Sequence, residues 1–496
     1  MKSLCSLLLV LLTFGAAAQT DNHVIGKPDS VFSRVLNEKR KLLIYTPGNP
    51  QPGQRFPVLY VLDGDAHFRS VAAMIEQLGQ GGMSPLPPMI VVAIPNTDRT
   101  RDLTPTHIDS DPPMMDTSFS KNTGGGENFA AFIEKELIPH IDSAYPTQTY
   151  RILIGHSFGG LTVLNILTNH PQLFNSYIAI DPSMWYDKER FLKTTTEKLA
   201  GKSYKGKTLY IGIANTMAED MTLEKMRKDT SSDTRHIRSI FALDKFIRTH
   251  ASNGLSYSSK YYPDDDHGSV PLITEYDGLR YIFRWNRLRF SPADFNKPGI
   301  AVVDKIKKHY ATVSREMGYT VLPPEMDING LGYFALSQKK IDKATALFEL
   351  NIANYPNSGN TYDSYGDLLL AKNDTAAAIT NFKKALEMTK SEETRQKLDR
   401  LTGKATYNPG VKELEKFTGE FVFDNIPLSA TIFLKGEQLW VSATGQGEFE
   451  LVPVSINTFT LKNIPGYTLK FELEGDQAIG VTAVQPNGTF KAHRKK

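Results

Sequence analysis

Cysteine is almost absent from this chain: its 496 residues contain only Cys5. Cys5 lies in an N-terminal stretch, residues 1–18, with a lysine at its start, the apolar run Leu7–Leu12 and three alanines ending at Ala18. These features are typical of a secretory signal peptide cleaved near Ala18. Because cleavage would remove Cys5, we expect a mature chain without disulfides or thiol chemistry. The pattern predicts an exported protein, either periplasmic or secreted.

Long hydrophobic runs, charge imbalance and cofactor motifs are also missing. The run Leu7–Leu12 is far shorter than the roughly 20 apolar residues that span a bilayer, so we expect no membrane span. The net charge is only +3, which argues against a nucleic-acid partner. The chain has no G-x-x-x-x-G-K-[ST], no dinucleotide fingerprint, no H-E-x-x-H and no His/Cys cluster. We therefore expect neither a cofactor nor a metal.

The most informative pattern that is present contains a serine between two glycines. The β-prone run Ile152–Ile154 leads into Gly155-His-Ser-Phe-Gly, and a helix-like stretch, Leu161–Leu167, follows. Strand, G-x-S-x-G and helix in this order form the context of a nucleophile elbow, in which the serine hydroxyl is exposed above a sheet. The alternative is a plain glycine-rich turn. We predict that Ser157 is a catalytic nucleophile.

Strand-like and helix-like stretches alternate between residues 24 and 288. The expected strands are Lys41–Tyr45, Val58–Leu62, Met89–Ile94, Arg151–Ile154, Ser176–Ile180, Thr208–Ile213 and Ser256–Tyr262. The expected helices are Phe68–Gly79, Glu127–Tyr145, Gly160–Asn169, His236–Thr249 and Val270–Trp285. Several strands are continuous Val/Ile/Leu runs, as is typical of parallel strands buried on both faces. The alternation predicts an α/β fold with a doubly wound sheet.

A histidine follows the last expected strand, Ser256–Tyr262, in the turn Pro263-Asp-Asp-Asp-His267. Its place after the serine agrees with a chain order of serine, acid and histidine. We predict that His267 is a general base and then a general acid. The alternative is a surface histidine in an acidic turn.

The sequence leaves the acid open. It should lie between the strand Thr208–Ile213 and the helix that begins near His236. The candidates there are Glu219 and Asp220, followed in rank by Asp229 and Asp233. Asp264 to Asp266 could orient the histidine locally, and a serine–histidine dyad without an acid is a further possibility. We favour Glu219 or Asp220 because they come soonest after the strand.

Backbone amides and aromatic rings complete the expected site. The turn after the strand Val58–Leu62 offers Gly64 and Asp65 as donors to an oxyanion, with the N–H of Phe158 as their partner. The alternative is an ordinary β-to-α turn. The aromatic residues expected to form the wall of a substrate pocket are Trp185, Tyr186 and Phe68. They favour a bulky, ring-bearing substrate.

Five motifs together resemble a known family. They are Ile44-Tyr-Thr-Pro47, Leu62-Asp-Gly64, Gly155-His-Ser-Phe-Gly-Gly160, Asp181-Pro-Ser-Met-Trp185 and His267-Gly-Ser-Val270. As a set they resemble the esterase D-like α/β-hydrolases, and the last two are most similar to the enterochelin (siderophore) esterase branch. The resemblance covers about residues 30–288 and implies an α/β-hydrolase fold with Ser157 as nucleophile and His267 as base. It departs at Asn215, where many relatives have glutamate.

The chain changes character after residue 288. Residues 289–328 are expected to form a connector with a helix over Val302–Met317. In residues 329–402, similar residues recur 34 apart, the period of tetratricopeptide repeats. The recurring pairs are Gly332 with Gly366, Ala344 with Ala378, and Phe348 with Phe382. We predict a small all-α tetratricopeptide segment of two repeats that could bind a protein partner; two ordinary helix pairs are the alternative.

Residues 411–496 contain short alternating strands separated by turns. The expected strands are Phe421–Phe423, Thr431–Leu434, Gln438–Val441, Phe449–Val452, Thr458–Leu461 and Tyr467–Phe471. Such spacing predicts an antiparallel β module that is closed or nearly closed on itself.

These features favour an exported serine carboxylic-ester hydrolase acting through an acyl-enzyme. The expected substrate is a small-molecule or carbohydrate ester, such as a siderophore lactone or an aryl ester. A binding or scaffold protein with a degenerate hydrolase domain is the first alternative. A serine peptidase on the same fold is the second, because a fold by itself does not determine acyl specificity.

Overall fold

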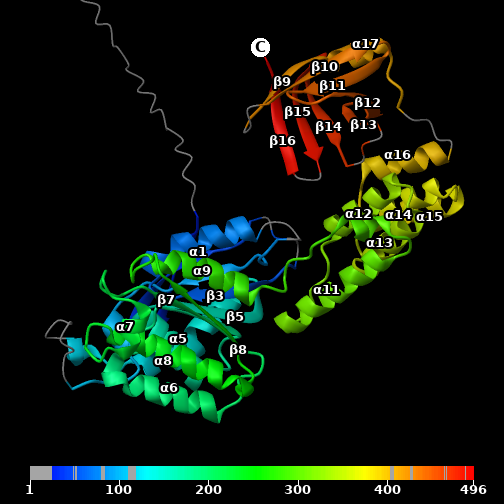
Figure 1. Cartoon of the computed structure of the whole chain (residues 1–496). Coiled ribbons are helices and arrows are strands. Elements are labelled where there is room, and N and C mark those ends of the chain that lie inside the picture. The colour runs from blue at the N-terminus through cyan, green and yellow to red at the C-terminus, as the bar shows by residue number, and fades with distance from the viewer. Residues whose placement is uncertain are drawn as a thin grey trace, which may run out of the picture. The chain divides into compact units, whose positions relative to one another are not determined.

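The computed structural model describes residues 25–48, 50, 53–79, 84–109, 119–402, 407–424, 428–462, 464, 466–485 and 488–495. The chain divides into two compact units (Figure 1). The first comprises residues 1–289 and 311–321, and the second comprises residues 290–310 and 322–496. The expected signal peptide, residues 1–18, lies outside the described residues. None of the helices in the described residues is both long and apolar enough to cross a membrane.

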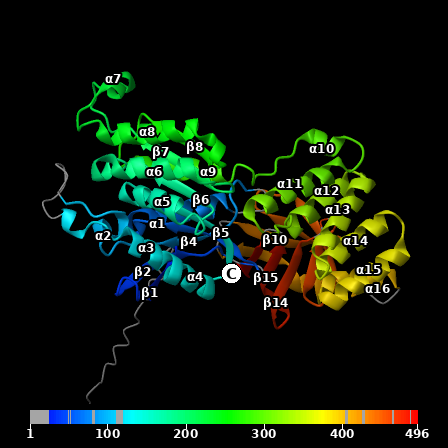
Figure 2. The same ribbon diagram turned by 90° about the horizontal axis from the view of Figure 1, so that it is seen from below.

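The first unit is built on an eight-stranded sheet in the order β1-β2-β4-β3-β5-β6-β7-β8. The strands are β1 (Lys27–Ser33), β2 (Glu38–Tyr45), β3 (Phe56–Val61), β4 (Ile90–Ala93), β5 (Thr147–His156), β6 (Ser176–Ile180), β7 (Thr208–Ala214) and β8 (Ser256–Tyr262). Neighbours from β4 to β8 pair in parallel, whereas β2 pairs antiparallel with both β1 and β4. In Figure 2, β1 and β2 lie at the edge of the unit away from β8.

Helices cover both faces of this sheet. One face carries α1 (Gly64–Leu78) and α9 (Val270–Ile282), which contact each other (Figure 1). The other face carries α3 (Gly126–Phe132), α4 (Ile138–Ala144), α5 (Phe158–Asn169), α6 (Arg190–Gly201) and α8 (Arg235–Thr249). Two shorter helices, α2 (Arg99–Leu103) and α7 (Leu223–Lys228), lie in the loops after β4 and β7. Helices on both faces confirm the predicted doubly wound α/β fold.

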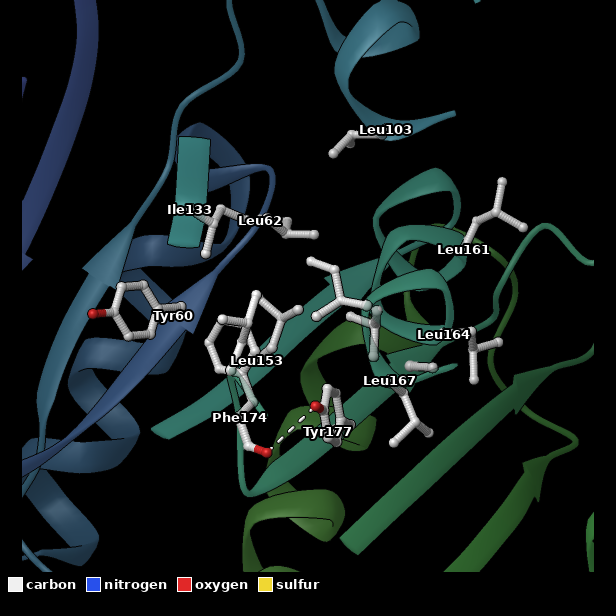
Figure 3. Packing of buried hydrophobic residues seen from close by; sticks show 14 of the residues in the cluster. Tyr60, Leu62, Leu103, Ile133, Leu153, Leu161, Leu164, Leu167, Phe174 and Tyr177 are labelled. Carbon is white, nitrogen blue, oxygen red and sulfur yellow. Dashed lines mark hydrogen bonds between the residues drawn. The ribbon is translucent and has the colours of Figure 1, made fainter. Parts of the chain in front are cut away.

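Two hydrophobic cores follow from this layering, one on each side of the sheet. Figure 3 shows the core on the α5 side of the sheet, a cluster that includes Leu153 of β5 and Leu161, Leu164 and Leu167 of α5. Strand residues such as Leu153 are fully buried because helices cover the sheet on both sides. The continuous apolar runs of the sequence are therefore strands buried on both faces of the sheet, as predicted.

The sequence-based prediction of this sheet was incomplete at its edge. It named every strand from β2 to β8 but not β1, whose segment has the mixed pattern Lys-Pro-Asp-Ser-Val-Phe-Ser. Most β1 side chains are partly or fully exposed, because the strand lies at the sheet's edge and pairs on only one side. An edge strand has little need of a hydrophobic pattern, so the sequence shows no clear signal for it.

After α10 (Pro292–Asn296) and the start of α11 (Ala301–Met317), the second unit continues with paired helices. They are α12 (Glu325–Ser337), α13 (Ile341–Asn354), α14 (Gly359–Ala371), α15 (Thr375–Met388) and α16 (Glu392–Leu401). Gly332 lies against the ring of Phe348, and 34 residues later Gly366 lies against Phe382 in the same way. In both pairs an added Cβ would lie 2.6 Å from the ring, so only glycine allows this approach. The repeated contact agrees with the predicted period, and the tetratricopeptide assignment itself stays a prediction.

The C-terminal part of this unit is a closed antiparallel barrel in the order β10-β11-β12-β13-β14-β15-β16-β9. Its strands are β9 (Gly419–Phe423), β10 (Ser429–Lys435), β11 (Gln438–Ala443), β12 (Glu448–Ser455), β13 (Thr458–Leu461), β14 (Thr468–Glu474), β15 (Gln477–Gln485) and β16 (Gly488–Arg494). The predicted β module is confirmed, although the sequence did not indicate β15 and β16. Phe417, just before β9, fills the interior with Phe459 and Phe471.

Candidate active site

Ser157 lies on a strained turn between β5 and α5. Its backbone has φ 60° and ψ −115°, a left-handed conformation that side-chain-bearing residues rarely adopt. The turn is so tight that a Cβ on Gly155 would lie 2.4 Å from the backbone of Gly159. The sequence therefore needs glycine at this position, and the turn has the geometry of the predicted nucleophile elbow.

Hydrogen bonds hold the elbow against the neighbouring strand. The Ser157 N–H donates to the carbonyl of Ile180, the last residue of β6, at 2.9 Å. The Ser183 N–H donates to the Ser157 carbonyl at 3.1 Å, and the two serine hydroxyl oxygens lie 3.3 Å apart. Ser157 is thus fixed at the carboxyl end of the parallel sheet, next to the segment Asp181–Trp185.

The predicted base, His267, meets a carboxylate in this region. His267 Nδ1 donates to Asp181 Oδ2 at 2.6 Å, and the His267 ring lies 4.4 Å from that of His156, the neighbour of Ser157. Asp181 is fully buried, whereas the His267 side chain is 42% exposed. A buried carboxylate on Nδ1 leaves Nε2 as the nitrogen able to exchange a proton with a hydroxyl.

Asp181 accepts two further hydrogen bonds. His236 Nε2 donates to Oδ2 at 2.8 Å, and the Ala214 amide donates to Oδ1 at 3.0 Å. Burial raises the pKa of Asp181, but the hydrogen bonds from His236 and His267 outweigh it and hold this pKa well below its usual range. Asp181 is therefore an ionised carboxylate at neutral pH.

The structure places a different carboxylate beside His267 from those ranked first in the sequence. Glu219 and Asp220 are exposed on the loop after β7, and it is Asp181, directly after β6, that contacts His267. Asp229 instead accepts hydrogen bonds from Ser231 and Thr234. Asp233 accepts one from Ser232. The sequence offered Asp181 only as the start of an aromatic segment, because its proximity to His267 depends on strand order.

The other acidic residues near His267 stabilise the loop that carries it by accepting hydrogen bonds within that loop. Asp266 Oδ1 accepts the amides of Gly268 and Ser269, both at 2.8 Å, and Asp265 Oδ1 accepts the Ser269 hydroxyl at 2.9 Å. Asn215, at which the sequence departs from the family that it resembles, donates through its side chain to the Pro263 carbonyl at 2.9 Å. Asn215 thus ties the end of β7 to the loop that carries His267.

The predicted oxyanion donors separate into two groups. The Gly64 N–H is occupied, because it donates to the Ile94 carbonyl at 2.9 Å. The amides of Asp65 and Phe158 lie in the first turns of α1 and α5, where helix amides have no intrahelical acceptor. Gly64 has a steric role instead: a Cβ there would lie 2.7 Å from the Ile94 backbone.

Arg99 holds the loop that leads into α1. Its guanidinium donates to both oxygens of Asp63, at 2.6 and 2.9 Å, and to the His156 carbonyl at 3.3 Å. Asp63 has a left-handed backbone with φ 51°. Burial raises the pKa of Asp63, but the hydrogen bonds and the charge of Arg99 outweigh this effect and hold the pKa below its usual value. The pair is therefore ionic. Arg99 therefore links the α1 turn to the serine elbow.

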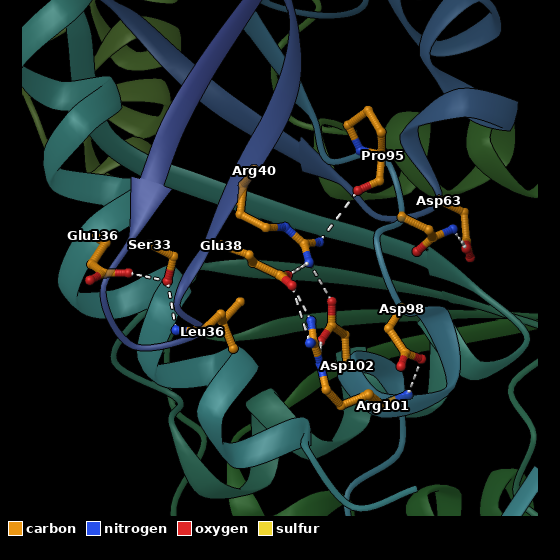
Figure 4. A network of polar contacts seen from close by, with 11 residues as sticks. Ser33, Leu36, Glu38, Arg40, Asp63, Pro95, Asp98, Arg101, Asp102 and Glu136 are labelled. Carbon is orange, nitrogen blue, oxygen red and sulfur yellow. Dashed lines mark hydrogen bonds and ion pairs between the residues drawn. The ribbon is translucent and has the colours of Figure 1, made fainter. Parts of the chain in front are cut away.

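A buried ion network fixes α2, the helix that begins with Arg99 (Figure 4). Arg40 is 1% exposed; its Nη1 lies 2.5 Å from Asp102 and 2.8 Å from Glu38, and it also donates to the Pro95 carbonyl. The Arg40 guanidinium lies over the neighbouring rings of Phe129 and Phe132, 5.5 and 5.6 Å from their centres. Such a multiply bonded cation gives α2 a single position relative to the sheet.

The aromatic residues predicted to line a pocket lie in two places. Phe158 packs against Phe119, Trp185 and Tyr186, with ring centres 5.6, 5.9 and 6.0 Å away. Trp185 is partly exposed, but Tyr186 is buried and donates to the Thr106 carbonyl at 2.5 Å. Phe68 packs in the core under α1, on the opposite face of the sheet from Phe158. Only Trp185 of the three predicted residues therefore combines contact with Phe158 and exposure.

His156 lies within a row of imidazoles. Its ring centre is 4.4 Å from that of His267 and 5.8 Å from that of His67. Burial, with help from the charges of the two neighbouring histidines, lowers the pKa of His156 to about 4. His156 is therefore neutral at physiological pH and adds no charge beside the serine.

Asp181, His236 and His267 are also the residues in the described part of the chain that could hold a metal ion. Their ligand atoms lie within 4.8 Å of one another. A two-histidine, one-carboxylate set suits Zn²⁺. Both nitrogens already donate to Oδ2 of Asp181, so a cation would have to replace two N–H protons.

Comparison with known proteins relates the first unit of this chain to esterases. Residues 33–248 match a family model described as "Putative esterase", a span that includes Ser157, Asp181 and His236 and ends before His267. A solved IroE-like serine hydrolase from Shewanella oneidensis is 31% identical, with a TM-score of 0.56. That likeness covers 66% of this chain and 98% of the solved one.

Two curated relatives are siderophore esterases. Ferri-bacillibactin esterase BesA of Bacillus subtilis is 33% identical over 173 residues, which are 33% of this chain and 60% of that protein. Apo-salmochelin esterase of Escherichia coli is 29% identical over 159 residues, 30% of this chain and 48% of that protein. The chain thus spans about half the length of the curated relatives that it matches. Through its first unit, the chain belongs to the esterase family.

Proposed function

We propose that this protein is a serine esterase in which Ser157, His267 and Asp181 form the catalytic triad. One observation carries the proposal: a buried, ionised Asp181 accepts a hydrogen bond from Nδ1 of a histidine that lies beside a strained serine elbow. This combination of nucleophile, base and orienting acid is the arrangement that activates a hydroxyl for acyl transfer.

The residues divide the reaction between them. Ser157 Oγ attacks the ester carbonyl carbon while His267 Nε2 takes its proton, and the same proton then passes to the leaving alcohol. The amides of Asp65 and Phe158 stabilise the negative oxygen that forms in each step. Water, deprotonated by His267, releases the acid and restores Ser157. Asp181 stays ionised throughout and stabilises the imidazolium.

A nearby serine provides a matched control for the test of the nucleophile. We expect Ser157→Ala to lose at least about 10³-fold in kcat on p-nitrophenyl acetate, and to lose fluorophosphonate labelling, with an unchanged melting temperature. Ser183→Ala removes a hydroxyl only 3.3 Å away and should keep both properties. Wild-type hydrolysis by Ser157→Ala would refute the assignment. An unlabelled wild-type protein would favour a scaffold with a degenerate hydrolase domain.

The substrate proposed for this site is a ring-bearing ester of the siderophore class. Two observations support it: relatives named as siderophore esterases, such as the siderophore enterobactin esterase of Emericella nidulans, and the aromatic cluster of Phe158, Phe119 and Trp185 beside the nucleophile. Flat rings pack favourably on such a cluster. A catecholate trilactone should therefore compete with fluorophosphonate labelling more strongly than a feruloylated sugar or a peptide. Stronger competition by the peptide would favour the peptidase alternative.

The remaining predictions concern location and partners. The signal-peptide pattern of residues 1–18 supports export, which fractionation of a cell that expresses the full chain would test. The helix pairs α12–α15 support a protein partner, because stacked helix pairs present extended binding surfaces. Cross-linking of the full chain in its native cells would test for such a partner.

A further inference from the structure

His236 is the second histidine on Asp181, and the reaction proposed above gives it no part. Its Nε2 lies 2.8 Å from Oδ2, the same oxygen that accepts from His267 at 2.6 Å. The two rings cross at 87° with their centres 5.2 Å apart. The carboxylate oxygen that orients the base is therefore shared between two imidazole donors.

We propose that His236 is a positioning residue of the esterase site, which fixes the Asp181 carboxylate so that Oδ2 stays aligned with His267 Nδ1. This inference rests on the proposed function. Asp181 directly follows the last residue of β6, and its N–H donates to the Gly212 carbonyl at 2.9 Å, which fixes its backbone but not the orientation of its carboxylate. The Ala214 amide holds Oδ1, and His236 supplies the second fixed donor, on Oδ2.

Hydrogen bonds in the loop before α8 fix the position of His236 next to Asp181. Thr234 donates to Asp229 at 2.5 Å and accepts from Arg238 Nε at 2.8 Å, which pins the first turn of the helix. Arg238 also donates to the Ser231 carbonyl at 2.6 Å. His236 therefore comes from a helix start with a fixed position. The helix that follows the loop expected to supply the acid thus carries a histidine that donates to the acid.

Three substitutions separate the hydrogen bond from the bulk of the ring. His236→Phe keeps the ring and removes the donor, and His236→Asn shortens the polar group so that its amide cannot reach Asp181. His236→Gln places an amide N–H near the position of Nε2. We expect the first two to lower kcat about 10- to 100-fold, because a hydrogen bond to a charged group is lost, with KM unchanged. His236→Gln should restore most of kcat.

His140→Gln is the matched control. His140 Nε2 donates to Asp29 Oδ2 at 3.1 Å in the same unit, and this pair lies away from the residues of the proposed triad. We expect the control to leave both kcat and KM at wild-type values. A general loss of stability from replacing a histidine would appear in the control as well.

A spectroscopic readout makes the inference independent of activity. The His267 Nδ1–H, bonded to a buried carboxylate, should give a far-downfield proton resonance that is lost in Asp181→Asn. We expect this resonance to shift in His236→Phe and His236→Asn, and to return in His236→Gln. An unchanged resonance, or unchanged kcat, in a folded His236→Phe or His236→Asn would overturn the inference. A wild-type protein that resists fluorophosphonate would refute the proposed function, while the resonance would still decide the role of His236.

Discussion

At the scale of single residues, the carboxylate of Asp181 is kept ionised in the protein interior by the hydrogen bonds that it accepts. It is fully buried, yet it accepts hydrogen bonds from His267, His236 and the Ala214 amide. Three donors offset the cost of burying a charge, which would otherwise favour the neutral acid. The result is a fixed anion that can keep an imidazole in one tautomer.

Replacement of this carboxylate should therefore have a large effect on catalysis. In Asp181→Asn the side chain no longer selects the Nδ1–H tautomer of His267. We therefore expect kcat/KM to fall by up to about 10⁴-fold. Alanine at Glu219 or Asp220 should change it roughly tenfold or less, because exposed carboxylates act through screened solvent. Kinetics on a p-nitrophenyl ester would check both. A large loss in Glu219→Ala with an active Asp181→Asn would reverse the assignment.

His156 leads to a prediction about stability and pH. Its pKa in the folded protein is about 4, against 6.5 for an unperturbed histidine, so between these values the unfolded chain binds the proton that the folded chain excludes. The stability contributed by neutral His156 is full above about pH 6.5 and is lost as pH falls towards 4. Between pH 7 and pH 5 the loss is roughly 2 kcal/mol.

Urea unfolding of the wild-type protein and of His156→Leu at the two pH values would measure this contribution. We expect the leucine variant to lose less of its free energy of unfolding on acidification, because it has no proton to exclude. Equal losses in the two proteins would show that other groups cause the acid sensitivity.

At the scale of elements, the site depends on where strands and helices end. Ser157 follows β5, Asp181 follows β6, and the His267 loop follows β8, so the carboxyl ends of three parallel strands supply the three residues. Parallel strands bring their carboxyl ends to one edge of the sheet, where ligands commonly bind in open α/β folds. The start of α8 adds His236 to the same edge.

The start of α8 can be disturbed without touching the triad. Asp229 accepts from Thr234 and Ser231 and does not contact His267. We expect Asp229→Ala to loosen the first turn of α8 and to lower kcat/KM about threefold to tenfold through His236. Asp233→Ala, in the same loop, is the control and should stay near the wild-type value. The view that this loop positions His236 would fail if both variants matched the wild type.

At the scale of the whole molecule, the chain is divided into two units with separate hydrophobic cores. The proposed triad belongs to the first unit, and the barrel core around Phe417 belongs to the second. Units with separate cores can lose their structure in separate transitions. The barrel closes its sheet completely, which removes exposed strand edges.

A cavity in the barrel should therefore affect one unit and spare the other. Phe417 is 1% exposed and packs against Phe459 and Phe471, with ring centres 4.8 and 5.0 Å away. We expect Phe417→Ala to destabilise the barrel by about 3–5 kcal/mol. Calorimetry of the full chain should show one transition moved to lower temperature, while the temperature at which esterase activity is lost stays unchanged. A matching shift in both would show that the units unfold together.

Local sequence was sufficient wherever a short pattern has one structural meaning. Glycines at fixed spacing around Ser157, apolar runs in buried strands and the 34-residue recurrence of Gly332 and Gly366 determined the elbow, the sheet and the helix pairs. Polar edge strands such as β1 carry no such pattern, because a strand paired on one side buries little.

Only the tertiary structure decided which acid meets His267. Asp181 is 86 residues away along the chain, and the contact exists because β6, β7 and β8 lie in this order in the sheet. The same order brings in His236 from α8, while Glu219 and Asp220 are left exposed on the loop after β7. The separation of two residues along the sequence does not predict such a contact. Parallel strands are connected by long crossovers, yet their carboxyl ends lie together at one edge of the sheet.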